Sequence, residues 1–65
     1  MKTWVKYWRV RQGMTQAELA IKAGTTQHAI SDIEQGTGNP TLRTLDRISD
    51  ALNVHLADLR INWKG

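Results

Sequence analysis

The chain has 65 residues, which is enough for one compact domain and too few for two. It contains no cysteine, which excludes a disulfide framework and a thiolate metal site and fits a reducing, cytoplasmic setting. Apolar runs are only a few residues long, so we expect neither a membrane-spanning helix nor a signal peptide. Nine lysine and arginine residues against six acidic ones give a net charge of +3, which favours polyanionic partners.

Glycine and proline cut the chain into segments of roughly helical length, and no stretch alternates apolar and polar residues for long. The sequence therefore predicts a single all-α domain over residues 1–65. Its expected helices cover residues 3–12, 15–23, 26–35, 41–52 and 55–60.

The first expected helix has Thr3 as its N-cap, Trp8 in the core and Gly13 as a left-handed stop. The second begins with the capping box Thr15-Gln16-Ala17-Glu18, in which hydroxyl and carboxylate each accept a backbone N–H. Small apolar residues follow up to Gly24, which allows another helix to approach closely.

The third expected helix follows the N-cap Thr26 and has two contrasting faces. Its apolar side holds Ala29, Ile30 and Ile33. The opposite side is polar and nearly uncharged, and consists of Gln27, His28, Ser31, Asp32 and Gln35. This pattern predicts one packed face and one face that offers hydrogen-bonding groups to a partner.

Apolar residues recur every three or four positions in the fourth expected helix, at Leu42, Leu45, Ile48 and Leu52. Asn53 is a candidate left-handed cap. A short fifth helix is expected to turn Leu56 and Leu59 inward.

Two helices of about eight residues joined at Gly24, the second with a hydrogen-bonding outer face, have the layout of a helix-turn-helix. The residues that carry a wider resemblance are Thr15-Gln16-Ala17-Glu18-Leu19-Ala20, Ala23-Gly24-Thr25-Thr26-Gln27, Ile33-Glu34-Gln35-Gly36 and Asn39-Pro40-Thr41-Leu42. Over roughly residues 5–59 the chain resembles the phage repressor/Cro family of helix-turn-helix regulators. The resemblance implies a compact, lambda-repressor-like five-helix bundle that binds a palindromic operator in double-stranded DNA as a homodimer. It also implies repression or activation of transcription, of which we expect repression.

The chain departs from the family pattern at three positions. Ile21 stands where a charged residue is usual, Asn53 where glycine is usual, and His55 where a Ser or Thr N-cap is usual. The first two leave DNA binding untouched, whereas the third weakens the start of the last helix.

The resemblance implies a recognition helix over about Gln27–Gln35. Gln27, His28 and Asp32 match base-reading positions, with Thr26 and Ser31 close by. A glutamine can pair with adenine, a histidine can donate to guanine, and an aspartate can accept from cytosine. Because phosphates repel a carboxylate, Asp32 could instead discourage wrong sequences or bond locally.

The resemblance also places Gln16 at a phosphate, where the helix dipole assists, although a solvated side chain is the alternative. Further phosphate candidates, each with the same alternative, are Arg11, Thr37, Gly38, Asn39 and Arg43. Arg9 and Glu34 match positions that form an ion pair between the first helix and the recognition helix.

The aromatic residues are numerous for so short a chain. Trp4, Tyr7 and Trp63 form either a cluster at the joined termini or part of a protein interface. Dimer contacts are expected around the turn into the fifth helix and the C-terminal segment, including Leu56, Ile61 and Trp63.

An enzyme would need a nucleophile and base or paired carboxylates in a cleft, which this sequence does not suggest. No cofactor is expected, and His55 has no second ligand at metal spacing, so no metal is expected either. A serious rival function is a protein-interaction module, such as an antitoxin of the same fold that masks a partner protein with a tryptophan-rich surface.

Overall fold

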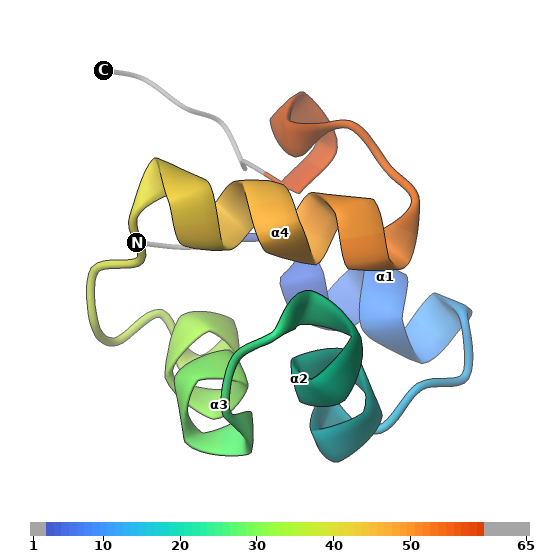
Figure 1. The fold of residues 1–65 in the computed structure, drawn as a ribbon, viewed down its shortest axis with the longest axis horizontal. Coiled ribbons are helices and arrows are strands. Elements are labelled where there is room, and N and C mark those ends of the chain that lie inside the picture. The colour runs from blue at the N-terminus through green and yellow to red at the C-terminus, as the bar shows by residue number, and fades with distance from the viewer. Residues whose placement is uncertain (1–2, 60–65) are drawn as a thin grey trace.

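A computed structural model describes residues 3–59, which contain four α-helices, one turn of 3-10 helix and no β-strand. The elements are α1 (Val5–Arg11), α2 (Gln16–Ala23), α3 (Gln27–Gln35), α4 (Leu42–Leu52) and η1 (Leu56–Leu59). In Figure 1, α4 crosses the middle of the molecule, with α2 and α3 on one side of it and η1 on the other. The all-α prediction is thus confirmed for this part of the chain, in which no helix is long and apolar enough to cross a membrane.

Side-chain caps start α2, α3 and α4, and the sequence predicts the first two of these caps. The Thr15 hydroxyl accepts from the Glu18 N–H at 3.0 Å, and the Glu18 carboxylate accepts from the Thr15 N–H at 2.8 Å, so the capping box is complete. Thr26 caps α3 and Thr41 caps α4 in the same way, through the N–H three residues on. Because these caps are local, they fix the helix starts without help from the rest of the fold.

The predicted N-cap of α1 is wrong by one residue. Trp4, not Thr3, occupies the N-cap position, and its N–H donates to the Leu59 carbonyl at 2.7 Å. The Thr3 hydroxyl still accepts from the Val5 N–H, at 3.3 Å. A backbone bond to the far end of the described chain therefore satisfies a Trp4 N–H that the helix itself leaves without a partner.

Within the described residues, which end at Leu59, the expected fifth α-helix over residues 55–60 is instead a 3-10 turn, Leu56–Leu59. Two hydrogen bonds between residues 55 and 58 accompany this turn. The Asp58 N–H donates to the His55 carbonyl at 2.9 Å, and the His55 N–H donates to the Asp58 carboxylate at 3.3 Å. His55 has no hydroxyl to cap a longer helix, so Asp58 supplies the side-chain contact. Before this turn Asn53 adopts the predicted left-handed conformation, with φ of 58°.

The core lies between the inner faces of the four helices and η1. Its fully buried side chains are Val5, Leu19, Ile30, Leu45, Ile48, Leu52 and Leu59. Leu42 was expected in this set but is exposed, because side chains lean toward the helix N-terminus and Leu42 is the first residue of α4. Trp8 and Ala29 are half-buried, and Trp8 packs against the core from its edge.

Candidate nucleic-acid interface

A tight turn at Gly24 sets α3 against α2. Gly24 has φ of 70°, a conformation that costs little only for glycine, and the following Thr25 N–H donates to the Ala20 carbonyl at 2.9 Å. Ile30 and Ile33 on the inner side of α3 are buried against the core. The outer side of α3 is consequently held outward as one rigid polar face.

Gln27 and His28, at the start of α3, are exposed on this outer face. Thr26 is also exposed, and its hydroxyl oxygen accepts from the Ala29 N–H as the N-cap. Ser31 is half-buried and accepts from the Gln35 side-chain amide at 3.2 Å. The five candidate base-reading residues therefore lie together along the first turns of one helix.

Asp32 has a neighbour that bears on its role. Its carboxylate lies 3.4 Å from Nε2 of His28, one turn earlier on α3, and the His28 side chain is 87% exposed. A pair this exposed contributes little to stability. It does place the imidazole beside the carboxylate, as a local interaction of Asp32 within α3 would require.

The loop after α3 folds back on the end of that helix. The Thr37 N–H and hydroxyl both donate to the Asp32 carbonyl, at 3.0 and 3.2 Å, so both donors are engaged within the protein. Gly38 has φ of 76°, and a Cβ placed on it would lie 3.8 Å from the Asp32 Cβ. Asn39 is exposed near the end of this loop, and Arg43 is exposed in the first turn of α4.

Gln16 stands at the first position of α2 and is half-buried. Its Nε2 donates to Oε1 of Glu34 on α3 at 3.0 Å. Since the capping box uses the N–H groups of Thr15 and Glu18, those of Gln16 and Ala17 have no partner within the helix. The start of α2 is thus a set of donors beside the polar face of α3.

Arg9 and Glu34 form the ion pair that the resemblance implies. Nε of Arg9 lies 2.6 Å from Oε2 of Glu34 and Nη2 lies 3.1 Å from Oε1, with side chains only 12% and 4% exposed. Nη1 donates to the Met14 carbonyl at 2.7 Å. The hydrogen bond to Glu34 raises the pKa of Arg9 above its usual value; burial opposes this shift and the charge of Glu34 adds to it.

Arg11 is placed apart from this set. Its guanidinium donates to the Tyr7 hydroxyl at 3.3 Å and lies 5.8 Å from the centre of the Tyr7 ring. Arg9 and Arg11 are about 200° apart around α1, because each residue advances about 100°. The structure therefore groups Arg11 with the aromatic side chains, and a phosphate contact of Arg11 stays a prediction.

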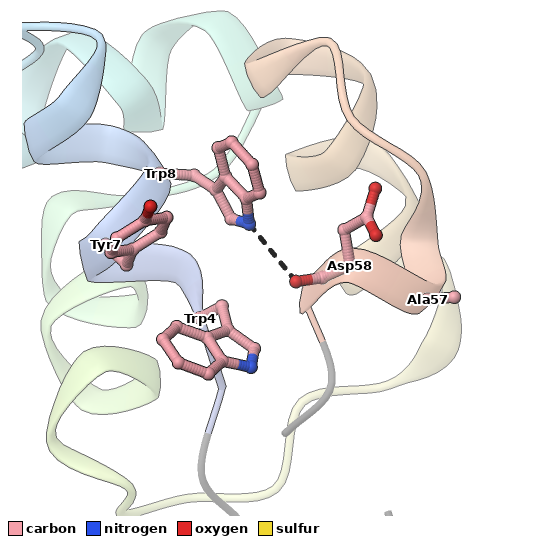
Figure 2. A pocket seen from close by; sticks show the side chains of 5 residues that line it. All are labelled: Trp4, Tyr7, Trp8, Ala57 and Asp58. Carbon is pink, nitrogen blue, oxygen red and sulfur yellow. Dashed lines mark hydrogen bonds between the residues drawn. The ribbon is translucent and has the colours of Figure 1, made fainter. Parts of the chain in front are cut away.

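A second surface feature lies between α1 and η1, and we call it the aromatic cleft (Figure 2). It has a volume of about 450 Å³ and is lined by Trp4, Tyr7, Trp8, Ala57 and Asp58. The Tyr7 ring meets the two indoles edge to face, at centroid distances of 5.3 Å to Trp4 and 5.1 Å to Trp8. The Trp8 indole N–H donates to the Asp58 carbonyl at 3.1 Å.

Of the expected dimer contacts, Leu56 is half-buried on η1. Ile61 and Trp63 lie outside the described residues, so their contribution to the dimer and to an aromatic cluster stays a prediction. Across residues 3–59 no three histidine, aspartate or glutamate side chains are grouped as they would be around a metal ion.

Sequence reasoning missed the bond from Gln16 to Glu34 and the bond from the Gln12 amide to the Leu52 carbonyl, which is 2.6 Å long. Neither has a local signal, since the partners are 18 and 40 residues apart. The pair of His28 and Asp32 is different, because its four-residue spacing on a helix could have revealed it.

In this chain α2 leads through a glycine turn into α3, which buries an apolar face and exposes a polar one. This arrangement defines a helix-turn-helix protein. The sequence model of the family described as Helix-turn-helix matches residues 5–59. An uncharacterized HTH-type transcriptional regulator of Archaeoglobus fulgidus is 39% identical over 61 residues, which are 94% of this chain and 87% of that protein. The immunity repressor protein of Bacillus phage phi105 is 34% identical over 53 residues, 82% of this chain and 37% of the repressor.

Among solved structures, that of the biofilm master regulator SinR in complex with DNA superposes with a TM-score of 0.76 at 33% identity. The match covers 82% of this chain and 86% of the SinR chain. The chain belongs to the helix-turn-helix family of DNA-binding transcriptional regulators.

Proposed function

We propose that this chain binds a palindromic operator in double-stranded DNA as a homodimer and acts as a repressor of transcription. The observation that carries the proposal is α3, which buries Ile30 and Ile33 and presents Gln27 and His28 to solvent on a rigid frame. In a helix-turn-helix, such a helix lies in the major groove and its first residues contact base edges. The similarity of this chain to a phage immunity repressor supports repression rather than activation.

Gln27 and His28 are the proposed principal base readers, because both side chains are exposed at the start of α3. Thr26 and Ser31 flank them and can donate through their hydroxyls to base edges. Asp32 is proposed to orient His28 and to disfavour bases that offer no donor, since its carboxylate lies beside the imidazole.

The proposed phosphate contacts surround this helix. Gln16 and the open N–H groups at the start of α2 face one backbone, aided by the helix dipole. A second set follows α3 in the chain and consists of Gly38, Asn39 and Arg43. Thr37 joins this set only when its hydroxyl turns from the Asp32 carbonyl to the phosphate. These contacts place the helix in the groove without themselves carrying sequence information.

A dimer is proposed because one small module buries too little surface to select a genomic site. Contacts at η1, with Leu56 and the segment that holds Ile61 and Trp63, would leave α3 free, since η1 lies across α4 from α3 in Figure 1. Two copies of α3 about 34 Å apart would then enter successive major grooves.

The dimer can be tested by titrating the protein onto duplexes that carry one or two half-sites about 10 base pairs apart. We expect two protomers to bind the two-site duplex cooperatively, with an affinity per site well above that of the single site. Equal, independent affinities for both duplexes would contradict the dimer.

Replacing Arg43 by alanine is expected to weaken binding to every duplex alike. It should also make the slope of log K against log salt shallower by about one unit, because one phosphate charge is no longer neutralised. Arg47→Ala is the matched control, because it removes the same charge from the same helix, α4. Arg47 lines a hollow with Ile21 and Asp50 and is not among the proposed phosphate contacts. An unchanged slope for Arg43→Ala, or an equal change for both variants, would remove Arg43 from the interface.

The aromatic cleft favours a second candidate function, the masking of a partner protein. Trp4 and Tyr7 are 42% and 46% exposed and their rings are in contact, so they form a continuous apolar surface of the kind that marks protein interaction sites. Under this alternative Trp4→Ala would abolish binding of the partner and leave DNA binding intact. Failure of the chain to prefer any duplex sequence would favour the alternative over the regulator.

A further inference from the structure

Glu34 is a shared acceptor at the junction of three helices. Its Oε2 accepts from Arg9 Nε on α1, and its Oε1 accepts both from Arg9 Nη2 and from Gln16 Nε2 on α2. The side chain is only 4% exposed. A role as the partner of Arg9 accounts for the first two bonds but not for the third.

The third bond has a consequence for the Gln16 amide. An amide has a donor end and an acceptor end of nearly equal size, and a carboxylate can accept only from the donor end. Glu34 therefore holds Nε2 of Gln16 at 3.0 Å and keeps Oε1 away from itself. A phosphate likewise accepts only, so the second N–H on Nε2 is the group that it requires.

Arg9 adds a second constraint on the same region. While two of its nitrogens bind Glu34, Nη1 donates to the carbonyl of Met14, which directly precedes the N-cap Thr15. The entry into α2 is thereby tied to α3 through one buried guanidinium. The bonds among Arg9, Gln16 and Glu34 thus fix the position of the proposed phosphate donors on α2 relative to the proposed base readers on α3.

We propose that Glu34 is a positioning residue for DNA binding, which orients the Gln16 amide so that it donates to phosphate and fixes the start of α2 relative to α3. The inference rests on the proposed function, because Gln16 is there a phosphate contact. A carboxylate ordinarily weakens the binding of DNA by repelling phosphates. Under this proposal the buried carboxylate of Glu34 strengthens it.

The direction in which DNA affinity changes in one variant separates this role from simple electrostatics. Glu34→Gln keeps the side-chain shape but replaces a pure acceptor by an amide, which can face Gln16 with either end. Removing a negative charge alone would tighten DNA binding. We expect Glu34→Gln to weaken it about tenfold, the loss that accompanies one hydrogen bond to a charged group.

The matched control is Glu18→Gln, which removes a carboxylate from the same end of α2 while keeping the capping box, because glutamine also serves there. This control should bind duplex DNA as tightly as the unaltered protein or more tightly. All affinities are measured at one salt concentration and corrected for the folded fraction found by circular dichroism.

A double-mutant cycle then separates positioning from a general loss of structure. If Glu34 acts through Gln16, the double variant Gln16→Ala/Glu34→Gln binds no more weakly than Gln16→Ala alone. In the free protein, the side-chain amide resonances of Gln16 should shift in Glu34→Gln and stay in place in Glu18→Gln.

The outcomes distinguish the inference from the function on which it depends. Absence of salt-dependent duplex binding by the unaltered protein overturns both. Normal binding by the unaltered protein, together with Glu34→Gln affinity that is unchanged or tighter, overturns only the positioning role. Additive losses in the cycle, with unmoved Gln16 amide resonances, do the same.

Discussion

Arg9→Met is expected to lower the free energy of unfolding by about 3–5 kcal/mol, because it leaves the carboxylate of Glu34 buried without its charged partner. Glu34 is 4% exposed and receives two hydrogen bonds from Arg9, so water cannot replace them without opening the contact between α1 and α3. A chain of this size has a total stability of roughly 3–10 kcal/mol, so part of the variant should be unfolded at room temperature. Urea denaturation followed by circular dichroism measures the loss.

Two further variants make this result specific. Arg11→Met removes an exposed guanidinium from the same helix and should change stability by no more than about 0.5 kcal/mol. The double variant Arg9→Met/Glu34→Leu strands no charge and should recover much of the lost stability. An Arg9→Met midpoint equal to that of the unaltered protein would show that the pair does not hold the two helices together.

Features that depend on a few neighbouring residues could be predicted from the sequence. The capping box at Thr15 and Glu18 and the left-handed Asn53 need only local geometry, and the structure has both. The outer face of α3 also follows from spacing alone, because Ile30 and Ile33 mark its buried side.

Features set by contacts between distant segments could not be predicted in this way. The Trp4 N–H donates to the Leu59 carbonyl at the other end of the described chain, and no local pattern signals that bond. For the candidate site, sequence identified the polar residues but not the bond that commits one N–H of Gln16 to Glu34.

Gln27→Ala and His28→Ala are each expected to reduce affinity for the preferred duplex by about 1–3 kcal/mol, the energy of one good base contact. Both side chains are exposed and neither packs in the core, so stability should hardly change. Affinity for a scrambled duplex should also stay nearly constant, since phosphate contacts do not depend on base sequence. Specificity is therefore lost before binding itself.

The discrimination ratio between two duplexes tests the assignment of α3 as the reading helix most directly. The preferred duplex is first obtained by selection from random double-stranded DNA, and its dissociation constant is then compared with that of a scrambled duplex at the same salt concentration. We predict that the selected site has twofold symmetry and that the ratio falls about 5- to 150-fold in Gln27→Ala and His28→Ala. Full discrimination retained by both variants, or no enriched sequence for the unaltered protein, would contradict the account.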